Sequence, residues 1–367
     1  MPAQELSLTN YRNYKQLNLT FSPNINIFFG ENAQGKTNII EAVFINAVGK
    51  SHRSTNDTDL INLDETLAKI KLNYTKLNVP NSNEFIFSRE NRRTIIKNEK
   101  KTTLGNIIGG FNAVLFSPED LMLIKGAPAL RRKFLDREIS QANPAYYHEL
   151  CKFNKITTQR NALLKNIRDN KFAADSLDVW DEQFAQSAAK IIRIRIEAVK
   201  KLSNIAADAQ KIISAQRENL IINYIISEKD DSDEFDENFY KKQLYKRRQT
   251  DILRGTTGIG PQHDDFSSNI NDINLKSYGS QGQQRTAVLA LKLAEMQFLH
   301  DETGEYPVLL LDDVMSELDA GRRKSLTEFL REKNIQTIIT ATDKHYFSDV
   351  QDASFWQVTN GKIQKMT

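Results

Sequence analysis

Residues 25–53 read INIFFGENAQGKTNIIEAVFINAVGKSHR, and this stretch decides how the chain is built. A short apolar run typical of a buried strand ends at Gly30, and the apolar-rich stretch from about Lys36 to Val48 predicts a helix. The turn between them has the spacing G-x-x-x-x-G-K-[ST], which holds phosphate groups when a strand precedes it and a helix follows. We therefore predict that a nucleotide is bound by Gly30, Glu31, Asn32, Ala33, Gln34, Gly35, Lys36, Thr37 and Asn38.

The residue types in this loop suit the chemistry of a nucleoside triphosphate. Glycines let the backbone curl so that successive N–H groups face a phosphate, and the following helix adds the positive end of its dipole. Lys36 is placed to reach the β- and γ-phosphates, and the hydroxyl of Thr37 is a ligand for Mg²⁺. The loop therefore predicts both a nucleotide and a magnesium ion.

A second stretch, YPVLLLDDVMSELDAGRR at residues 306–323, supplies the acidic half of such a site. Four apolar residues lead into Asp312 and Asp313, as expected for a buried strand whose carboxyl end reaches the nucleotide. We expect Asp312 to hold Mg²⁺ together with Thr37, and Asp313 to polarise the attacking water. Lys36, Asp312 and Asp313 are the predicted catalytic residues, and Thr37 and Asp312 are the predicted metal ligands.

The run SQGQQ, residues 280–284, comes before a strongly helical stretch from about Gln283 to His300. A small, polar, glycine-containing turn at a helix N-terminus is a second anion site, although it is also an ordinary helix cap. One chain does not need two γ-phosphate sites, but a head-to-tail pair does. We expect Ser280, Gly282 and Gln283 to close on the nucleotide held by a partner copy.

Together these residues resemble an ABC-type ATPase head, with Walker A at 30–37, SQGQQ as the signature, LLLDD as Walker B and SELD as the D-loop. The closer resemblance is to the RecF family of bacterial recombination-repair proteins. It is carried over nearly the whole chain by LTNYRNY, GENAQGKTNIIEAV, FSPEDLMLIKGAPALRRKFLD, GPQHDDF, SQGQQRTAVLALKLAE and LLLDDVMSELD.

This resemblance implies an ATP-dependent homodimer that binds DNA at gaps or single-strand/double-strand junctions. It implies that the dimer loads the strand-exchange recombinase together with a RecR-type partner. It also implies that Arg12 and Asn13 contact the adenine or the ribose; a turn that closes on the core is the alternative.

Several positions depart from transporter-type ATPases. Asp313 stands where those proteins carry a glutamate, so we expect slow hydrolysis. No glutamine occupies the expected Q-loop, where Glu119 or Asp120 is the candidate substitute. Thr340 and Thr342 replace the switch histidine, with His345 a weaker candidate. The motif GPQHDDF also departs from the family pattern that it resembles, because Gln262 stands between Pro261 and His263 where family members usually have Gly-Pro-His.

The predicted fold is α/β: an ABC-type ATPase head, a P-loop NTPase, split by a compact and mainly helical insertion. Residues 1–113 and 256–367 form the head, and residues 114–255 form the insertion, where helical periodicity takes over. A long helix near residues 180–214 is expected to place Lys190, Arg193 and Arg195 on its polar side. The strand-like LIINYII and the broken heptads favour a compact lobe over a coiled-coil arm.

The overall composition does not identify a binding partner, so any nucleic-acid contact has to come from local basic patches. With 50 Lys plus Arg against 47 Asp plus Glu in 367 residues, the chain neither requires nor excludes a polyanion. Lys50, Arg53, Arg131 and Arg132 are candidate DNA contacts, with surface clusters or interdomain salt bridges as the alternatives; the run YKKQLYKRR is a weaker candidate. The single cysteine and the lack of a signal peptide or a long apolar run indicate a cytoplasmic protein without a membrane partner.

Two other classes remain open. A phosphotransferase would use the same phosphate loop on a small substrate, but it leaves the SQGQQ turn unexplained. An ATPase subunit of a transporter would need a membrane partner, and the altered signature and the missing Q-loop glutamine argue against it.

Overall fold

The computed structural model describes residues 1–169, 173–227, 235–316, 319–343, 347 and 353–366. The chain divides into two compact units, which are described separately. The sheet unit comprises residues 1–121, 212–214 and 288–367, and the helical unit comprises residues 122–211 and 215–287. The domain boundaries expected at 113/114 and 255/256 stay predictions. The two compact units meet in the sequence at 121/122 and at 287/288 instead.

Two six-stranded sheets form the described part of the sheet unit. The first is antiparallel, in the order β2-β1-β4-β5-β6-β7. The second has the order β15-β14-β3-β13-β12-β8, and its strands are parallel except for the β14–β15 hairpin. The first sheet consists of β1 (Ala3–Tyr11), β2 (Tyr14–Thr20), β4 (Leu67–Lys76), β5 (Val79–Ser88), β6 (Thr94–Lys97) and β7 (Lys100–Thr102). The second consists of β3 (Ile25–Phe29), β8 (Ala113–Phe116), β12 (Val308–Asp312), β13 (Thr337–Ala341), β14 (Ala353–Thr359) and β15 (Lys362–Lys365).

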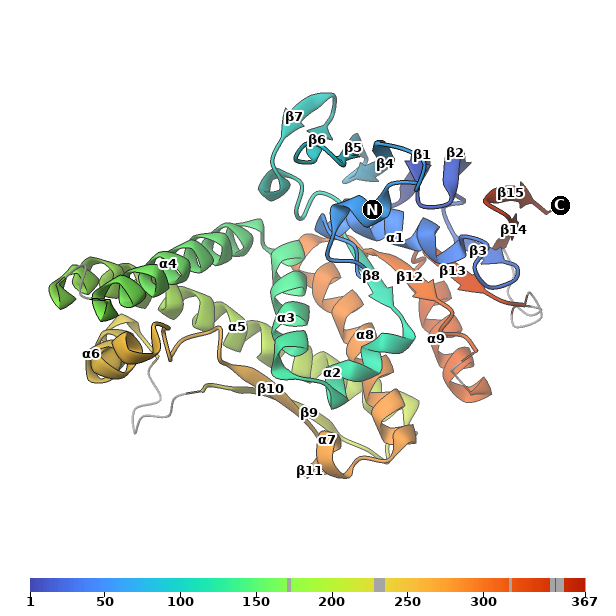
Figure 1. Cartoon of the computed structure of the whole chain (residues 1–367). Coiled ribbons are helices and arrows are strands. Elements are labelled where there is room, and N and C mark those ends of the chain that lie inside the picture. Colours follow the sequence, from blue (N-terminus) through green and yellow to red (C-terminus); the bar gives the residue numbers. More distant parts are fainter. Residues whose placement is uncertain (170–172, 228–234, 317–318, 344–346, 348–352, 367) are drawn as a thin grey trace. The chain divides into compact units, whose positions relative to one another are not determined.

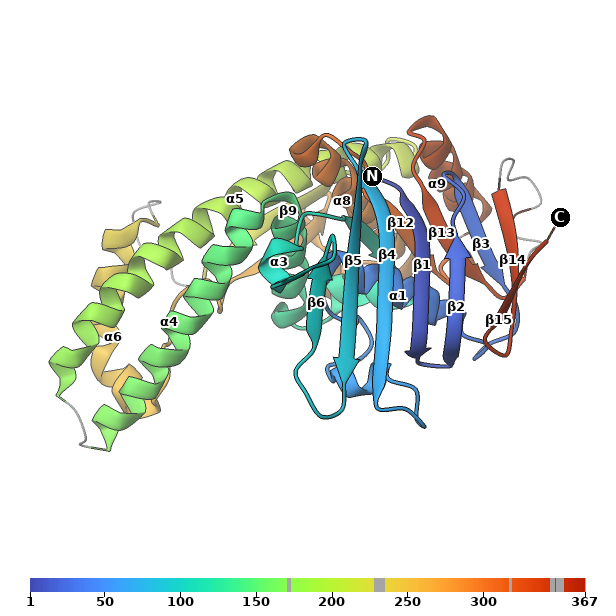
Figure 2. The same cartoon turned by 90° about the horizontal axis from the view of Figure 1, so that it is seen from above.

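Helix α1 (Lys36–Val48) lies between the two sheets and packs against strands of both (Figure 1). Because the helix is covered on two sides, its buried residues are not confined to one stripe. Its buried residues include Ile39, Ile40, Val43 and Phe44, which join one hydrophobic core with side chains of both sheets. On the other face of the parallel sheet lie α9 (Ala320–Glu332) and the C-terminal part of α8 (Gln281–Thr303) (Figures 1 and 2).

The order of the parallel strands positions the predicted site. Strands β3 and β12 lie on either side of β13, so the carboxyl ends of all three meet at one edge of the sheet. The phosphate loop follows β3, and Asp312 ends β12. The buried strands before Gly30 and Asp313 and the helix from Lys36 to Val48 that the sequence predicted are confirmed.

The helical unit combines helices with a small antiparallel sheet of order β11-β10-β9. Its helices are α2 (Met122–Lys125), α3 (Pro128–Ala142), α4 (Pro144–Arg168), α5 (Asp178–Ile213), α6 (Glu237–Arg254) and α7 (Leu275–Tyr278). Its strands are β9 (Leu220–Ile225), β10 (Asp265–Ile270) and β11 (Ile273–Asn274). None of the helices in the described ranges is both long and apolar enough to cross a bilayer.

Helix α5 is a single long helix, but one expectation about it is wrong. Lys190 and Arg193 are exposed, whereas Arg195 is only 2% exposed and does not belong to the polar side. Its guanidinium contacts both carboxylate oxygens of Asp136 and donates to the carbonyl of Pro261 at 2.6 Å. Helical spacing alone could not reveal this, because the buried position depends on a carboxylate 59 residues away.

The motif GPQHDDF, residues 260–266, holds the helical unit together. His263 contacts the carbonyl oxygen of Thr257 through Nε2 at 3.0 Å, and Asp264 accepts from the Tyr224 hydroxyl at 2.8 Å. Burial raises the pKa of Asp264, although hydrogen bonds from Ser227 and Tyr224 oppose the shift. The contacts of this motif with α5 and β9 are therefore internal to the unit.

A buried arginine joins three helices of the same unit. Arg160 on α4 is fully buried; it donates to Asp181 on α5 at 2.7 Å and to Asp251 on α6 at 3.0 Å. Removing one partner of a buried ion network leaves uncompensated charges and costs about 3–5 kcal/mol. We expect Arg160→Met to lower the free energy of unfolding, measured by urea denaturation, by about that amount.

The control for this substitution is Arg168→Met. Arg168 pairs with Asp169 at 3.4 Å, and both side chains are nearly half exposed. Its loss should cost less than about 1 kcal/mol, because exposed ion pairs contribute little. Equal effects of the two substitutions would contradict a structural role for the Arg160 network.

Candidate nucleotide site

The phosphate loop depends on glycine at two positions. Gly30 has φ +148° and Gly35 has φ +112°, a region that side chains other than glycine rarely adopt. A Cβ at Gly30 would lie 2.4 Å from the carbonyl oxygen of Val358, and one at Gly35 would lie 2.6 Å from Nδ2 of Asn13. The loop is therefore packed closely between β14 and the β1–β2 turn, and its backbone conformation is set by these contacts.

Lys36, the first residue of α1, points back over this loop. Its ammonium donates to the carbonyl oxygens of Gly30 at 2.5 Å and Glu31 at 2.7 Å, and the residue is only 7% exposed. Burial lowers the pKa of Lys36, while the negative charges of Asp313 and Asp312 oppose that shift. The structure thus brings the three predicted catalytic residues within electrostatic reach of one another.

Thr37 and Asp312, the two predicted metal ligands, are in contact. The Thr37 hydroxyl donates to Oδ1 of Asp312 at 2.9 Å, and the Thr340 hydroxyl on β13 donates to the same oxygen at 2.7 Å. A hydroxyl next to a carboxylate oxygen suits Mg²⁺, which prefers oxygen ligands and keeps several waters. The donor set therefore fits the ion. Thr340 orients Asp312 from β13, the strand between β3 and β12. Thr342, in contrast, is exposed.

Asp313 has a left-handed backbone. Its φ is +55°, and its N–H donates to the Thr340 hydroxyl oxygen at 3.0 Å, while its carbonyl accepts from the Ser316 hydroxyl at 2.9 Å. Residues held in this region cost free energy unless their surroundings fix them, and they concentrate at functional sites. The strain supports the choice of Asp313 as a functional carboxylate.

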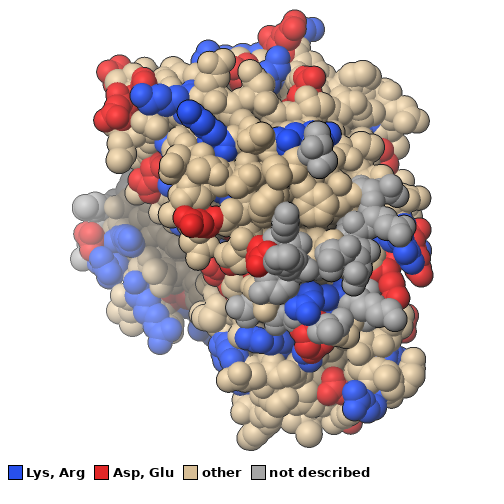
Figure 3. All heavy atoms as spheres, turned by 90° about the vertical axis from the view of Figure 1, so that its right-hand side faces the viewer, with Lys and Arg blue, Asp and Glu red and all other residues tan. Residues whose placement is uncertain are grey.

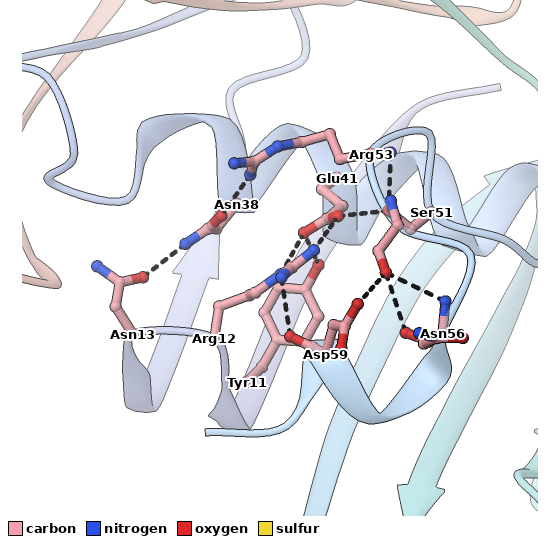
Figure 4. A network of polar contacts seen from close by, with 10 residues as sticks. Tyr11, Arg12, Asn13, Asn38, Glu41, Ser51, Arg53, Asn56 and Asp59 are labelled. Carbon is pink, nitrogen blue, oxygen red and sulfur yellow. Dashed lines mark hydrogen bonds and ion pairs between the residues drawn. The ribbon is translucent and has the colours of Figure 1, made fainter. Parts of the chain in front are cut away.

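Arg12 and Asn13, expected near the adenine or ribose, have contacts of their own. Arg12 has a left-handed backbone with φ +52°. Its guanidinium forms a bidentate ion pair with Glu41, with Nη2 2.7 Å from Oε1 and Nε 2.9 Å from Oε2. Asn13 donates to the carbonyl oxygen of Gln34 at 3.0 Å, so it contacts the phosphate loop itself. Figure 4 shows both residues in one polar network beside α1.

The segment after β8 stands at the expected Q-loop. Asp120 accepts from the N–H of Ser117 at 2.8 Å and pairs with Lys292 of α8 at 3.1 Å, whereas Glu119 is exposed. The carboxylate of Asp120 therefore contacts Ser117 and Lys292, whereas the carboxylate of Glu119 faces solvent. The sequence analysis did not single out Lys292 or Glu41; the available signal was a charged residue within an otherwise apolar helical stretch.

The SQGQQ turn belongs to the helical unit and begins helix α8. The N–H of Gln283 donates to the Ser280 hydroxyl oxygen at 3.2 Å, and the N–H of Ser280 donates to Oε1 of Gln283 at 3.0 Å. This reciprocal pair is a capping box, which fixes the first turn of a helix. Ser280 and Gly282 are nonetheless exposed, so the helix N-terminus is open to a ligand or partner.

The predicted basic contacts differ in accessibility. Lys50 and Arg53 are exposed, and Arg53 donates to Oδ1 of Asn38 at 2.9 Å. Arg131 is only 5% exposed and forms a two-pronged ion pair with Asp265, so it is not available at the surface. Arg132, in contrast, is partly exposed and donates to the carbonyl oxygen of Asp264 at 2.8 Å.

Charges of both signs are mixed on the face shown in Figure 3, where Lys and Arg side chains alternate with Asp and Glu. His345, the weaker switch candidate, and part of the expected D-loop lie outside the described residues.

Comparisons with known proteins agree with this geometry. The profile of the RecF/RecN/SMC N terminal domain family matches residues 3–365. The DNA replication and repair protein RecF of Clostridium perfringens strain 13 is 41% identical over 367 residues, covering 99% of this chain and 100% of that protein. RecF of Clostridium beijerinckii is 42% identical over 366 residues, covering 99% and 98%.

Solved structures give the same result. A structure of the recombination mediator protein RecF-ATPrS in the RecFOR pathway has a TM-score of 0.91 and 36% identity, covering 100% of this chain and 98% of that one. The Smc head domain with an extended coiled coil from Pyrococcus furiosus, bound to the C-terminal domain of ScpA, has a TM-score of 0.57 at 14% identity. It covers 100% of this chain and 96% of that one, and it supports the fold alone.

The α/β ATPase-head fold that the sequence predicted is therefore confirmed. The matches extend from the first strand to the last, so both units are included. Family profile, curated relatives and solved structures agree that this chain belongs to the RecF family.

Proposed function

We propose that this protein is an ATP-driven DNA-repair protein that closes as a homodimer on DNA and assists recombination. The observation that carries the proposal is the contact of Thr37 with Asp312 beside the phosphate loop, because it joins the two halves of a nucleotide site from segments 275 residues apart. Relatives over the full length are named DNA replication and repair proteins, and structural neighbours are described as RecF-ATP and as a recombination mediator.

In this proposal, the chain's own groups bind and orient the triphosphate. The loop N–H groups and the N-terminus of α1 hold the phosphates, and Lys36 exchanges the carbonyl oxygens of Gly30 and Glu31 for phosphate oxygens. Thr37 and Asp312 would hold Mg²⁺, which supplies positive charge to the phosphates when bound. Thr340 keeps the Asp312 carboxylate oriented through its 2.7 Å hydrogen bond.

Hydrolysis is proposed to be slow. Asp313 polarises the attacking water as general base, but its side chain is one methylene shorter than a glutamate. A shorter carboxylate reaches less far toward a water at the γ-phosphate. ATP binding therefore acts as the closing signal, and its hydrolysis reopens the dimer.

The exposed turn at the start of α8 supports the proposed dimer. Ser280 and Gly282 are exposed at a helix N-terminus whose first turn is capped by the Ser280–Gln283 pair. An exposed N-terminus attracts anions through its N–H groups and its dipole. We propose that this turn meets the γ-phosphate bound by a second copy, so that each nucleotide is held by both chains.

DNA contact is assigned to the exposed basic residues. The candidate DNA contacts are Lys50, Arg53 and the partly exposed Arg132. Arg131 is not one of them, because it is buried against Asp265. The preferred substrate in this proposal is gapped or junction DNA, and the partner is a RecR-type mediator. The activity is placed in the cytoplasm. All four assignments rest on family membership together with the accessible charges.

The two alternatives make different predictions. A phosphotransferase would need an acceptor beside the phosphate loop and would have no use for the exposed turn at Ser280. A transporter subunit would copurify with a membrane protein. Full-length similarity to proteins named for DNA replication and repair favours the proposed function over both.

Sedimentation velocity with ATP and Mg²⁺ tests the dimer, and Asp313→Asn sharpens the test. Asparagine tolerates the left-handed backbone at φ +55° and keeps the size of the side chain, but it cannot act as a base. We expect the variant to bind ATP, hydrolyse it at least about 100-fold more slowly and accumulate as a dimer. DNA titrations then follow on that dimer. A variant that stays monomeric at saturating ATP would contradict the clamp.

A further inference from the structure

Two side chains on one face of α1 join the same two segments of the chain. Asn38 and Glu41 are three residues apart, so they lie one turn apart on the helix surface. Each contacts the β1–β2 turn on one side and the segment 51–53 on the other, as Figure 4 shows. We call these two sets of contacts the Asn38 bridge and the Glu41 bridge.

The Asn38 bridge leads directly to the phosphate loop. Asn38 donates to Oδ1 of Asn13 at 2.8 Å and accepts from Nη1 of Arg53 at 2.9 Å. Asn13 in turn donates to the carbonyl oxygen of Gln34 at 3.0 Å. Gln34 therefore connects to Arg53 through a chain of three hydrogen bonds beside the first residues of α1.

The Glu41 bridge is buried. Glu41 is fully buried, and its carboxylate accepts from the Tyr11 hydroxyl at 2.7 Å, from Arg12 twice and from the Ser51 hydroxyl. Burial by itself would raise the pKa of Glu41, but hydrogen bonds from Arg12, Ser51 and Tyr11 outweigh it and lower the pKa below its usual value. The carboxylate is thus ionised, and Arg12 provides its neutralising charge.

Ser51 extends this bridge into the segment that follows α1. Its hydroxyl oxygen accepts from the N–H groups of Arg53 and Ser54, both at 3.0 Å. Arg12 reaches the same segment from the other side, with Nη1 2.8 Å from the carbonyl oxygen of Asp59. Side-chain contacts therefore attach residues 51–59 to α1 and to the β1–β2 turn.

We propose that Asn38 and Glu41 are positioning residues through which nucleotide binding orders segment 51–59, and that Arg12 acts by neutralising Glu41 rather than by contacting the nucleotide. This inference rests on the proposed function, because it requires ATP at the phosphate loop. A nucleotide that fixes the loop at Gln34 also fixes Asn13, and so it favours the arrangement in which Asn38 holds Arg53. Coupling of this kind is reciprocal, so order in the segment also strengthens nucleotide binding.

The alternative is that Glu41 and Arg12 are an inert ion pair of the core, or that Arg12 contacts the base. An inert pair would change stability but not the response of the segment to ATP. A direct contact by Arg12 would be lost with Arg12 whatever residue stands at 41. These differences make the three cases separable.

Hydrogen exchange measured with and without ATP tests the coupling. We expect ATP to slow amide exchange in residues 51–59 of the wild-type protein, because local opening of this segment becomes less favourable. In Asn38→Ala the segment should lose most of this ATP-dependent change, whereas the melting temperature without ATP should change little. Arg331→Gln is the matched control, since Arg331 is exposed on the last turn of α9 and should respond as wild type.

Double substitution tests the role of Arg12. Arg12→Gln leaves Glu41 buried without its cation, so we expect the dissociation constant for ATP to rise about tenfold. Adding Glu41→Gln removes the stranded charge and should restore that constant to within about threefold of wild type, because the two residues act as one unit. The comparison is made well below the melting temperature of each variant.

Each outcome decides something different. A double variant as impaired as Arg12→Gln would overturn the role given to Arg12 and assign it to the nucleotide. Binding of ATP without any change of exchange in residues 51–59 would overturn the coupling and leave the proposed function intact. Failure of the wild-type protein to bind ATP would instead refute the proposed function.

Discussion

We expect Lys36→Arg to keep the fold and to lower the rate of ATP hydrolysis by about 100-fold or more, because electrostatic groups aimed at the transferring phosphate carry this much of the rate. Lys36 is a compact ammonium that fits between the carbonyl oxygens of Gly30 and Glu31 at 2.5 and 2.7 Å. A planar guanidinium cannot occupy that space in the same way. The measurement is steady-state phosphate release at saturating ATP.

Lys101→Arg is the matched control, because Lys101 is exposed on β7 in the first sheet. Its turnover should equal that of the wild-type protein. Circular dichroism and the melting temperature should show that Lys36→Arg remains folded, since the hydrogen bonds of Lys36 within the described residues go to the loop carbonyls of Gly30 and Glu31. Normal turnover in Lys36→Arg would refute the role assigned to this residue.

Ser280→Arg should abolish the ATP-dependent dimer while leaving ATP binding by the single chain within about threefold of wild type, because we propose that Ser280 serves the nucleotide of the partner copy and not that of its own chain. The substitution places a long, bulky side chain in an exposed turn that we propose to close on a partner's phosphate, so the side chain would occupy the space that the phosphate needs. It also removes the hydroxyl that caps Gln283, which costs about 1 kcal/mol at a helix N-terminus. That loss is too small to unfold the chain.

Sedimentation velocity with ATP and Mg²⁺ measures the dimer, and equilibrium binding of a fluorescent ATP analogue measures the single-chain affinity. Ser277→Arg adds the same charge on the neighbouring helix α7 and serves as the control. The proposal expects this control to dimerise. If Ser280→Arg dimerises as well as wild type, the turn at 280–283 is only a helix cap.

The sequence allowed the nucleotide site to be predicted because its determinants are local. The spacing from Gly30 to Thr37 and the position of Asp312 at the end of an apolar run each fit within a few residues, and strand order brings them together. The contact between Thr37 and Asp312 then follows from parallel strands that share one edge.

The burial of individual arginine side chains could not be predicted in the same way. Arg131 and Arg195 look like surface residues in a helical repeat, yet each is buried against an aspartate from a distant segment, Asp265 and Asp136 respectively. Whether an arginine faces solvent or a buried carboxylate depends on tertiary packing, which periodicity does not contain. The bridges at Asn38 and Glu41 were missed for the same reason.

The left-handed backbone at Asp313 bears on which carboxylate this position can carry. Of the acidic residues, aspartate tolerates φ +55° better than glutamate, because its short side chain forms local hydrogen bonds. Selection for a longer and faster base at this position would therefore act against the backbone conformation that Thr340 and Ser316 enforce. The backbone at this position therefore favours the shorter carboxylate, and the slow hydrolysis that we propose agrees with that preference.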